Sequence, residues 1–293
     1  MRRATTLLRL ALRFDWRGLL LVAGVAFAGA VSFQGSRGLY ETTEGRYVEC
    51  ARETMASGDY DDPILNGQPH WTKPPLTYLA IMAGMRAFGN SPWGARAYLV
   101  MAMVLSAGAI WLAGTSIWGT KAGLWAGLVF ATSPFMAGAA NVVSSDLMTA
   151  LWVAAATAAF WHGCAHRSSA SLLAMWVFLG LGFVTKGPPA LLVPAASLPV
   201  AAVLLRRGGA RRPPSWLSWA GLGLFLLVGL LWYVEEAQDT PGLLAYWLGK
   251  ELVGRNISGE FHRNPGLWVA FAMYLPLLLL GSGPWLPLVV LRG

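Results

Sequence analysis

Long apolar stretches dominate the chain, and its polar residues are gathered between them. A helix needs about 20 apolar residues to cross the hydrocarbon core of a bilayer. The apolar runs approach this length and show no alternation of period two, which argues against membrane-spanning strands. The pattern predicts an all-α, polytopic transmembrane bundle of about eight spans, over residues 18–33, 95–118, 122–141, 147–165, 171–185, 188–205, 215–234 and 266–290.

One polar stretch, between the first two predicted spans, is too long for a simple connection. Leu39 to Pro75 carries seven carboxylates, three cations and one histidine. Loops longer than about 12–15 residues are usually functional or disordered. Helical character from Glu44 to Ala56, with Gly58 as its C-cap, favours a folded loop. Pro74 to Gly89 then predicts a short amphipathic helix along the membrane interface.

The first apolar run has two interpretations. Five arginines precede it, and the sequence AFAGA within it offers small residues for cleavage of a signal peptide. The charged region is long and directly abuts the run, which favours a retained first helix. We therefore expect a multi-pass protein whose N-terminus is cytoplasmic.

Composition and charge fit this topology. Only 12% of residues are charged and the mean hydropathy is +0.51, whereas soluble domains carry roughly 25% charged residues. With the N-terminus inside, 12 of the 22 cations fall in short cytoplasmic loops and 13 of the 14 acids lie outside or at the outer rim. The net charge of +8 therefore reflects membrane orientation. The expected partner is the lipid bilayer, with no nucleic acid, and Cys50 and Cys164 lie on opposite sides of it.

The same topology gathers distant polar segments on the outer face. They are the first loop, Asp146, the stretch Thr185-Lys186-Gly187, and residues 235–265. Several cations near the bilayer boundary suit an anion such as a lipid phosphate or diphosphate, and the candidates are Arg46, Lys73, Lys186, Arg255 and Arg263. Snorkelling is the alternative for each. For Lys186 the sequence TKGPP favours binding, because unpaired backbone at membrane depth is tolerated mainly beside a cavity.

Three carboxylates are candidates for chemistry at this face. Glu41, Glu44 and Asp146 could serve as a general base toward an acceptor hydroxyl or help to hold a metal. The alternative is that Glu44 and Asp146 only stabilise helix N-termini through the macrodipole. His262 is a candidate metal ligand, although zinc normally needs three protein ligands.

Five blocks of sequence resemble one known family. TEGRYVECARETMASGDY, LNGQPHWTKPPLTYLA, SPFMAGAANVVSSDLMTALW, LGFVTKGPPALLVP and KELVGRNISGEFHRNPGLWVAFAMYLPLLLLGSGPW follow one another in order. They are similar to the bacterial aminoarabinose transferases and their protein O-mannosyltransferase-like relatives. These are membrane glycosyltransferases of the GT-C type that use a polyprenyl-phosphate sugar as donor.

The resemblance implies roles for individual residues. The family's Asp-Glu-x-Arg-Tyr stands here as Thr43-Glu44-Gly45-Arg46-Tyr47, so Glu44 or Glu41 would have to replace the catalytic aspartate. The family's Glu-Lys-Pro is Thr72-Lys73-Pro74, which makes Lys73 the matched ligand of the donor phosphate. His262 matches a metal-binding histidine, but the partner glutamate is Thr72, so a divalent metal stays open. Further matches are Asp146, Lys186, Glu251 and Arg255.

The function implied is that of an enzyme of the bacterial inner membrane, with its active site on the periplasmic side. It would transfer a sugar, with inversion, from undecaprenyl phosphate to lipid A, an envelope glycan or a protein. Residues 1–293 would form one domain, with a catalytic loop at 36–76 and a second periplasmic loop at 235–265. Family members usually continue into a C-terminal periplasmic domain, so a separate chain supplying that half is a further expected partner. A lipid-carrier-binding relative without catalysis and a membrane transporter are the alternatives.

Overall fold

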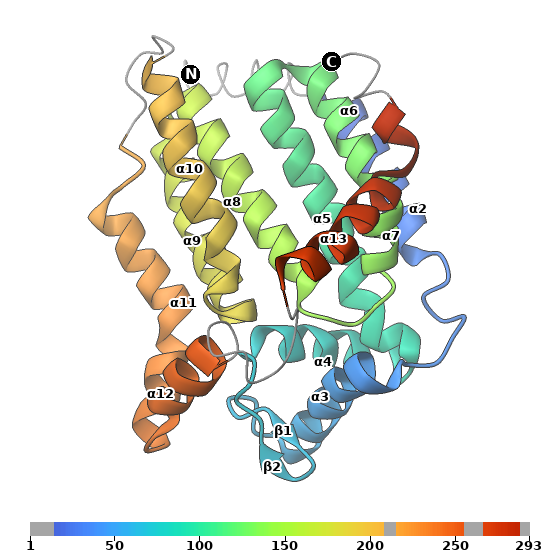
Figure 1. The fold of residues 1–293 in the computed structure, drawn as a ribbon, viewed down its shortest axis with the longest axis vertical. Coiled ribbons are helices and arrows are strands. Elements are labelled where there is room, and N and C mark those ends of the chain that lie inside the picture. Colours follow the sequence, from blue (N-terminus) through green and yellow to red (C-terminus); the bar gives the residue numbers. More distant parts are fainter. Residues whose placement is uncertain (1–14, 208–214, 255–265, 288–293) are drawn as a thin grey trace, which may run out of the picture.

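A bundle of long apolar helices stands on a layer of shorter polar elements (Figure 1). The computed structural model describes residues 15–207, 215–254 and 266–287. The bundle consists of α2 (Trp16–Val31), α5 (Pro92–Trp118), α6 (Thr120–Ala131), α8 (Asp146–His166), α9 (Ser169–Lys186), α10 (Pro189–Arg207) and α11 (Trp219–Asp239). The layer beneath it consists of the π-helical turn η1 (Glu41–Gly45), α3 (Arg46–Ser57), β1 (Ile64–Leu65), β2 (Gln68–Pro69), α4 (Leu76–Phe88), α12 (Leu243–Tyr246) and the π-helix η2 (Trp247–Gly254). We call the end of the bundle that carries this layer the first-loop face.

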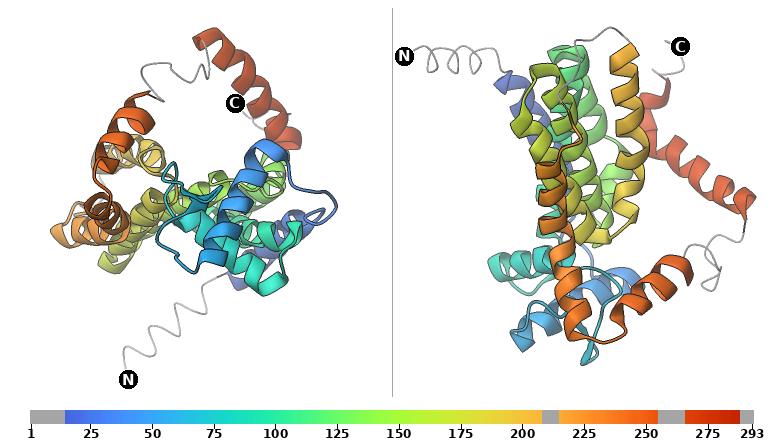
Figure 2. Two further views of the ribbon diagram at one scale, coloured as in Figure 1. Left: turned by 90° about the horizontal axis from the view of Figure 1, so that it is seen from below. Right: turned by 90° about the vertical axis from the view of Figure 1, so that its left-hand side faces the viewer.

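Three more elements lie along one side of the bundle. They are α7 (Pro134–Ala139), α13 (Leu267–Ser282) and the 3₁₀ turn η3 (Gly283–Trp285). The hydroxyl of Ser133 donates to the carbonyl of Gly281 over 2.5 Å, and the indole of Trp285 donates to Thr132 over 2.9 Å. Figure 2 shows the rest of α13 slanting away from the bundle.

The helical membrane fold is confirmed, but the count of eight spans is not. Among the described residues, five helices are long and apolar enough to cross a membrane: α5, α8, α9, α11 and Trp268–Trp285. Three shorter apolar helices cover Trp16–Val31, Leu76–Phe88 and Pro189–Leu205. The predicted span 122–141 is wrong as one helix, because α6 ends at Ala131 and Pro134 starts α7. Proline lacks the amide hydrogen that would continue the helix and disfavours helical backbone before it.

The polar layer differs from its prediction in detail. α3 begins at Arg46, after the π-helical turn, and ends at Gly58, whose φ of 79° makes the expected left-handed cap. Asn66 and Gly67 have φ values of 54° and 68°, as a tight hairpin turn requires, so the loop also contains a two-stranded ribbon. The segment expected as a loop from residue 235 is helical instead, since α11 continues to Asp239.

α4 crosses the lower end of the bundle, in the place expected for an interfacial helix (Figure 1). It packs on α5 and α3, and its buried side chains include Tyr78, Ile81, Met82 and Met85. Within the bundle, small residues allow close helix contact. A Cβ placed on Gly229 of α11 would lie 3.1 Å from the Cα of Gly180 in α9. The result is a tight bundle in which lipid-facing apolar side chains stay exposed.

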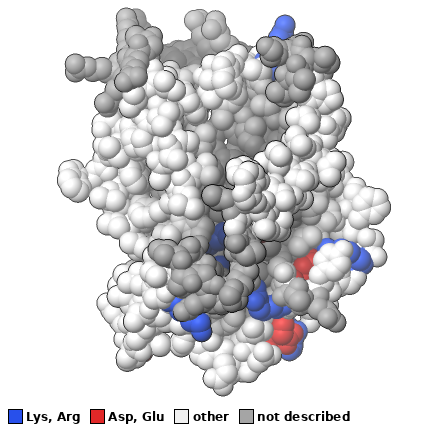
Figure 3. Space-filling model, viewed as in Figure 1, with Lys and Arg blue, Asp and Glu red and all other residues white. Residues whose placement is uncertain are grey.

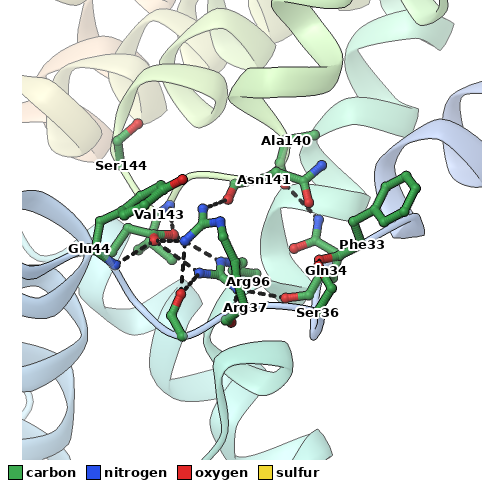
Figure 4. A network of polar contacts seen from close by, with 12 residues as sticks. Phe33, Gln34, Ser36, Arg37, Glu44, Arg96, Ala140, Asn141, Val143 and Ser144 are labelled. Carbon is green, nitrogen blue, oxygen red and sulfur yellow. Dashed lines mark hydrogen bonds and ion pairs between the residues drawn. The ribbon is translucent and has the colours of Figure 1, made fainter.

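A buried ionic network joins the polar layer to the bundle (Figure 4). The carboxylate of Glu44, which is fully buried, receives Nε and Nη2 of Arg96 over 2.9 Å each. It also receives Nη1 of Arg37 over 2.6 Å. Backbone amides complete its shell, from Tyr40 over 3.0 Å and from Val143 over 2.8 Å.

Arg96 is the other half of this network. Its side chain is buried in the first turns of α5, and its remaining hydrogen bonds go to the backbone carbonyls of Gln34, Arg37 and Gly38. The α2–η1 connection, α5 and the loop before α8 therefore meet at one ion pair. A buried charge pair is tolerated only when its hydrogen-bonding groups are satisfied, as they are here.

The pKa of Glu44 records this environment. Burial by itself would raise the pKa, but the hydrogen bonds from Arg96, Arg37, Tyr40 and Val143 outweigh it and lower the pKa from 4.5 to about 2. A depressed carboxylate pKa adds stability above its unfolded value, and this stability is lost as pH falls through the folded value. The network is therefore intact at neutral pH.

We predict that Gly123→Ala destabilises the bundle. Its new methyl group would meet the side chain and backbone of Thr115 and the backbone of Trp111 in α5, and overpacking of this kind typically costs about 1–3 kcal/mol. Thermal unfolding of the detergent-solubilised protein, followed by loss of the monodisperse peak, is the measurement. Gly24→Ala is the matched control, since nothing lies within 4 Å of its added methyl group; equal melting temperatures for the two variants would contradict the packing argument.

We predict that Arg96→Met is severely destabilising, by about 3–5 kcal/mol, because it leaves the Glu44 carboxylate buried with half of its partners. The double variant Glu44→Gln/Arg96→Met should recover part of this loss. Urea unfolding in detergent at pH 7 gives both values.

The pH dependence supplies an independent check. Since the pKa of Glu44 falls from 4.5 to about 2 on folding, the wild type should lose stability between these two values as pH decreases. Glu44→Gln should flatten this part of the profile. A profile unchanged by the substitution would show that the carboxylate does not supply the acid-labile stability.

Candidate functional site

Two of the predicted phosphate ligands line one cavity on the first-loop face. Lys73 comes from the end of the first loop and Lys186 from the last residue of α9, and the cavity between them has a volume of about 290 Å³. Its walls are mainly aromatic and apolar, with side chains of Trp71, Phe183, Trp232, Tyr233 and Trp247. Two ammonium groups in an otherwise apolar wall suit a ligand with an anionic head and a lipid tail.

The first loop and α11–η2 are tied together around this cavity. The indole of Trp247 donates to the carbonyl of Trp71 over 2.9 Å, and the indole of Trp232 donates to the carbonyl of Asp61 over 3.0 Å. The rings of Trp232, Tyr233 and Trp247 pack on one another with centroids 5.0–5.5 Å apart. Segments that are far apart in sequence thus build a single wall.

Lys186 also forms an ion pair with Asp146, the first residue of α8. The side chains are 28% and 65% exposed, and pairs at this exposure contribute at most about 1 kcal/mol. A second anion can therefore compete for the ammonium group at little cost. Asp146 in turn keeps a solvent-accessible carboxylate.

A second cavity lies on the other side of this ion pair. It has a volume of about 700 Å³ and is lined by α7, the start of α8 and the end of α13. Its polar lining comes from Thr43, Ser144 and Asp146. Thr43, which occupies the family's aspartate position, therefore shares a cavity with Asp146, while Lys186 faces the first cavity.

The remaining predicted residues do not all meet here. Glu44 lies beneath Thr43 with its oxygens fully enclosed, so it is placed to hold the backbone rather than to accept a proton from a substrate. Arg46 is exposed at the start of α3. The backbone of Glu41 lies in η1, and its side chain is outside the described part of the structure, as are Arg255, His262 and Arg263.

His70 is held next to these cations. Its Nε2 lies 2.5 Å from the hydroxyl of Thr72. Burial, and then the charges of Arg46 and Lys73, lower its pKa below the usual 6.5. The imidazole is therefore neutral at pH 7.

The described residues were also tested as a metal site. They contain no group of three or more His, Cys, Asp or Glu side chains that could hold an ion, and Thr72 is engaged with His70. These residues do not fit a metal, and no step below uses one. Burial raises the pKa of the Cys50 thiol to about 12, so this cysteine is no nucleophile either.

Several residues were missed by sequence reasoning. Arg96 stands within the apolar run of α5, and an arginine in such a run is itself a signal of a buried partner. Arg37 and His70 carried no comparable signal. Asp62, expected in a solvated turn, accepts the indole of Trp71 over 3.2 Å, because the loop folds back on itself.

Charge on the visible surface follows the same division (Figure 3). Blue and red side chains gather in the lower half, around the junction between the bundle and the polar layer, and basic ones reach into the hollow there. The surface of the bundle above is almost wholly uncharged in this view. An apolar band with a charged rim is what a membrane-spanning bundle requires.

Comparisons with known proteins agree with the resemblance seen in the motifs. The chain is 32% identical over 258 residues to the undecaprenyl phosphate-alpha-4-amino-4-deoxy-L-arabinose arabinosyl transferase of Edwardsiella ictaluri, covering 86% of this chain and 45% of the relative. It is 33% identical over 285 residues to transferase 1 of the same name from Sodalis glossinidius, covering 94% and 48%. The chain thus spans about half the length of the curated relatives it matches.

Two solved structures share the fold. ArnT from Cupriavidus metallidurans in the apo state has a TM-score of 0.74 at 24% identity, over 91% of this chain and 48% of its own. The same protein bound to undecaprenyl phosphate has a TM-score of 0.76 at 24% identity, over 93% and 50%. In addition, the model of the dolichyl-phosphate-mannose-protein mannosyltransferase family matches residues 72–234. This match covers more than half of the chain and contains Lys73, Asp146 and Lys186, and the chain belongs to that family of membrane glycosyltransferases.

Proposed function

We propose that this chain is a membrane glycosyltransferase, or the donor-binding part of one, that takes its sugar from a polyprenyl phosphate such as undecaprenyl phosphate. The observation that carries the proposal is the convergence of Lys73 and Lys186 in one aromatic-walled cavity. The ammonium groups would bind the phosphate and the apolar walls the first isoprene units of the carrier. The relatives whose printed names include undecaprenyl phosphate support the choice of carrier.

The ion pair between Lys186 and Asp146 then gains a role. A donor phosphate attracts the ammonium of Lys186, which weakens its hold on Asp146. The carboxylate of Asp146, exposed to the second cavity, becomes free to accept the proton of an acceptor hydroxyl. The resulting oxygen attacks the anomeric carbon, the bond from that carbon to the phosphate oxygen breaks, and the polyprenyl phosphate leaves with its charge held by the two lysines. Attack opposite the leaving phosphate inverts the anomeric centre.

Other residues would position these groups. Glu44 and Arg96 hold Val143 and the backbone around Thr43, so they orient the residues on both sides of the second cavity. Arg46 adds positive charge near His70. Thr43 offers a hydroxyl to the acceptor in place of the family's carboxylate.

The environment follows from the same proposal. The membrane would be a bacterial inner membrane, with the first-loop face toward the periplasm and the N-terminus in the cytoplasm, as the distribution of cations supports. The acceptor would be lipid A, an envelope glycan or a protein hydroxyl. The sugar-transfer activity of the whole relative would include groups from the half that this chain does not span.

A carrier-binding relative without transfer is the second candidate. The observation that favours it is that Glu44 has all its oxygens engaged while Thr43 stands at the aspartate position. This leaves Asp146 as the base among the described carboxylates of the second cavity. The two candidates differ in whether Asp146 is needed for turnover.

Lys73→Ala and Lys186→Ala should each weaken binding of undecaprenyl phosphate to the protein in nanodiscs by about ten- to hundredfold, because each removes a charge-assisted contact. Quenching of tryptophan fluorescence provides the affinity, since several tryptophans line the cavity. Lys121→Ala is the matched control, as this exposed lysine lies at the other end of α5, next to α6. Unchanged affinity in both cavity variants would refute the phosphate site.

Asp146→Asn should lower the rate of sugar transfer by about a hundredfold or more, which is the usual contribution of a general base. Carrier affinity should stay the same or increase, since Lys186 loses a competing anion. Release of undecaprenyl phosphate from a sugar-loaded carrier measures the first quantity and fluorescence quenching the second. A wild-type chain that binds carrier but releases none would select the candidate without transfer.

A further inference from the structure

A third hollow adjoins the lysine cavity. It is a cleft of about 320 Å³ between the loop segment from Pro69 to Thr72 and the segment from Thr240 to Tyr246. Trp71 and Thr72 line both this cleft and the lysine cavity, and Lys73 follows directly. A group attached to a phosphate at Lys73 would therefore have this cleft beside it.

The lining of the cleft combines flat rings with neutral hydrogen-bonding groups. The rings come from Trp71 and Tyr246, and the polar groups from His70, Thr72 and Thr240. The Tyr246 hydroxyl donates to Glu251 over 3.3 Å, which leaves its own oxygen as an acceptor. A pyranose presents apolar C–H faces together with hydroxyls that both donate and accept, and this mixed lining matches it.

The electrostatics of the cleft restrict which sugar fits. The charges that act on the His70 imidazole are those of Arg46 and Lys73, and Lys250 Nζ lies 5.7 Å from the centroid of the Tyr246 ring. The lining of the cleft contains no Asp or Glu. Nearby carboxylates are already engaged, since Asp62 accepts the Trp71 indole and Glu251 accepts the Tyr246 hydroxyl. An ammonium group placed here would meet cations without a free counter-charge.

We propose that this cleft holds the sugar of the donor and selects a neutral sugar over an amino sugar. The proposal rests on the proposed function, because the donor phosphate must first be held by Lys73 and Lys186. His70 accepts a hydrogen bond from a sugar hydroxyl while the ring of Trp71 packs on the sugar face. The curated relatives carry 4-amino-4-deoxy-arabinose in their names, so the donor of this chain would differ from the one those names print.

The test compares three ligands on the purified chain in nanodiscs at pH 7.5: undecaprenyl phosphate, the same carrier bearing arabinose, and the carrier bearing 4-amino-4-deoxy-arabinose. The arabinose carrier should bind about three- to tenfold more tightly than bare carrier, as one or two neutral hydrogen bonds provide. The amino sugar should bind about fivefold or more weakly than arabinose, because like charges repel in a partly desolvated site. Tighter binding of the amino sugar would overturn the selectivity.

Two variants locate the effect. His70→Ala should abolish most of the gain from arabinose while leaving the affinity for bare carrier unchanged, and Tyr246→Phe should reduce the gain if His70→Ala fails to fold. Gln68→Ala is the control, since this exposed residue lies in the same loop outside the cleft. A gain that survives both substitutions would place the sugar elsewhere, including a cleft that serves the acceptor instead. Loss of bare-carrier binding in the wild type would instead defeat the proposed function itself.

Discussion

The enclosed carboxylate of Glu44 is the interaction on which the first-loop face depends. Three segments that are distant in sequence donate to it or to its partner Arg96: the chain after α2, the first turns of α5, and the loop before α8. Burying such a charge is costly, and only a complete set of donors offsets the cost. Because the set is complete, the loop has one conformation relative to the bundle. The residues that line the two cavities are positioned as a consequence.

The two ion pairs of this face have opposite characters. Glu44 and Arg96 are buried and fully hydrogen-bonded, so their pairing is strong and leaves nothing for a substrate. Asp146 and Lys186 are partly exposed and meet through a single contact, so either one can exchange its partner for a ligand group. Rigid charges hold the frame, and exchangeable charges face the cavities.

Much of this arrangement could be anticipated from particular residues. Lys186 in TKGPP was predicted beside a cavity, and it lies in one with Lys73. The helix ending at Gly58 and the short helix after Pro74 were also predicted. The break at Pro134 and the continuation of α11 to Asp239 were not, because hydropathy averages over a window and does not register a single missing amide hydrogen or a buried acid such as Glu236. The role of Glu44 was misjudged because its partners lie up to 99 residues away.

The sequence by itself determined the class of the protein, since apolar run length and charge distribution dictate which segments can enter lipid and which cannot. It also determined the family, through motifs that survive in order along the chain. Only the tertiary structure decided which carboxylate is buried and which is free, and which aromatic side chains enclose the lysines. These properties depend on contacts between segments that no local pattern encodes: a carboxylate with four donors and a carboxylate in water are the same letter, and only their surroundings make one a support and the other a candidate base.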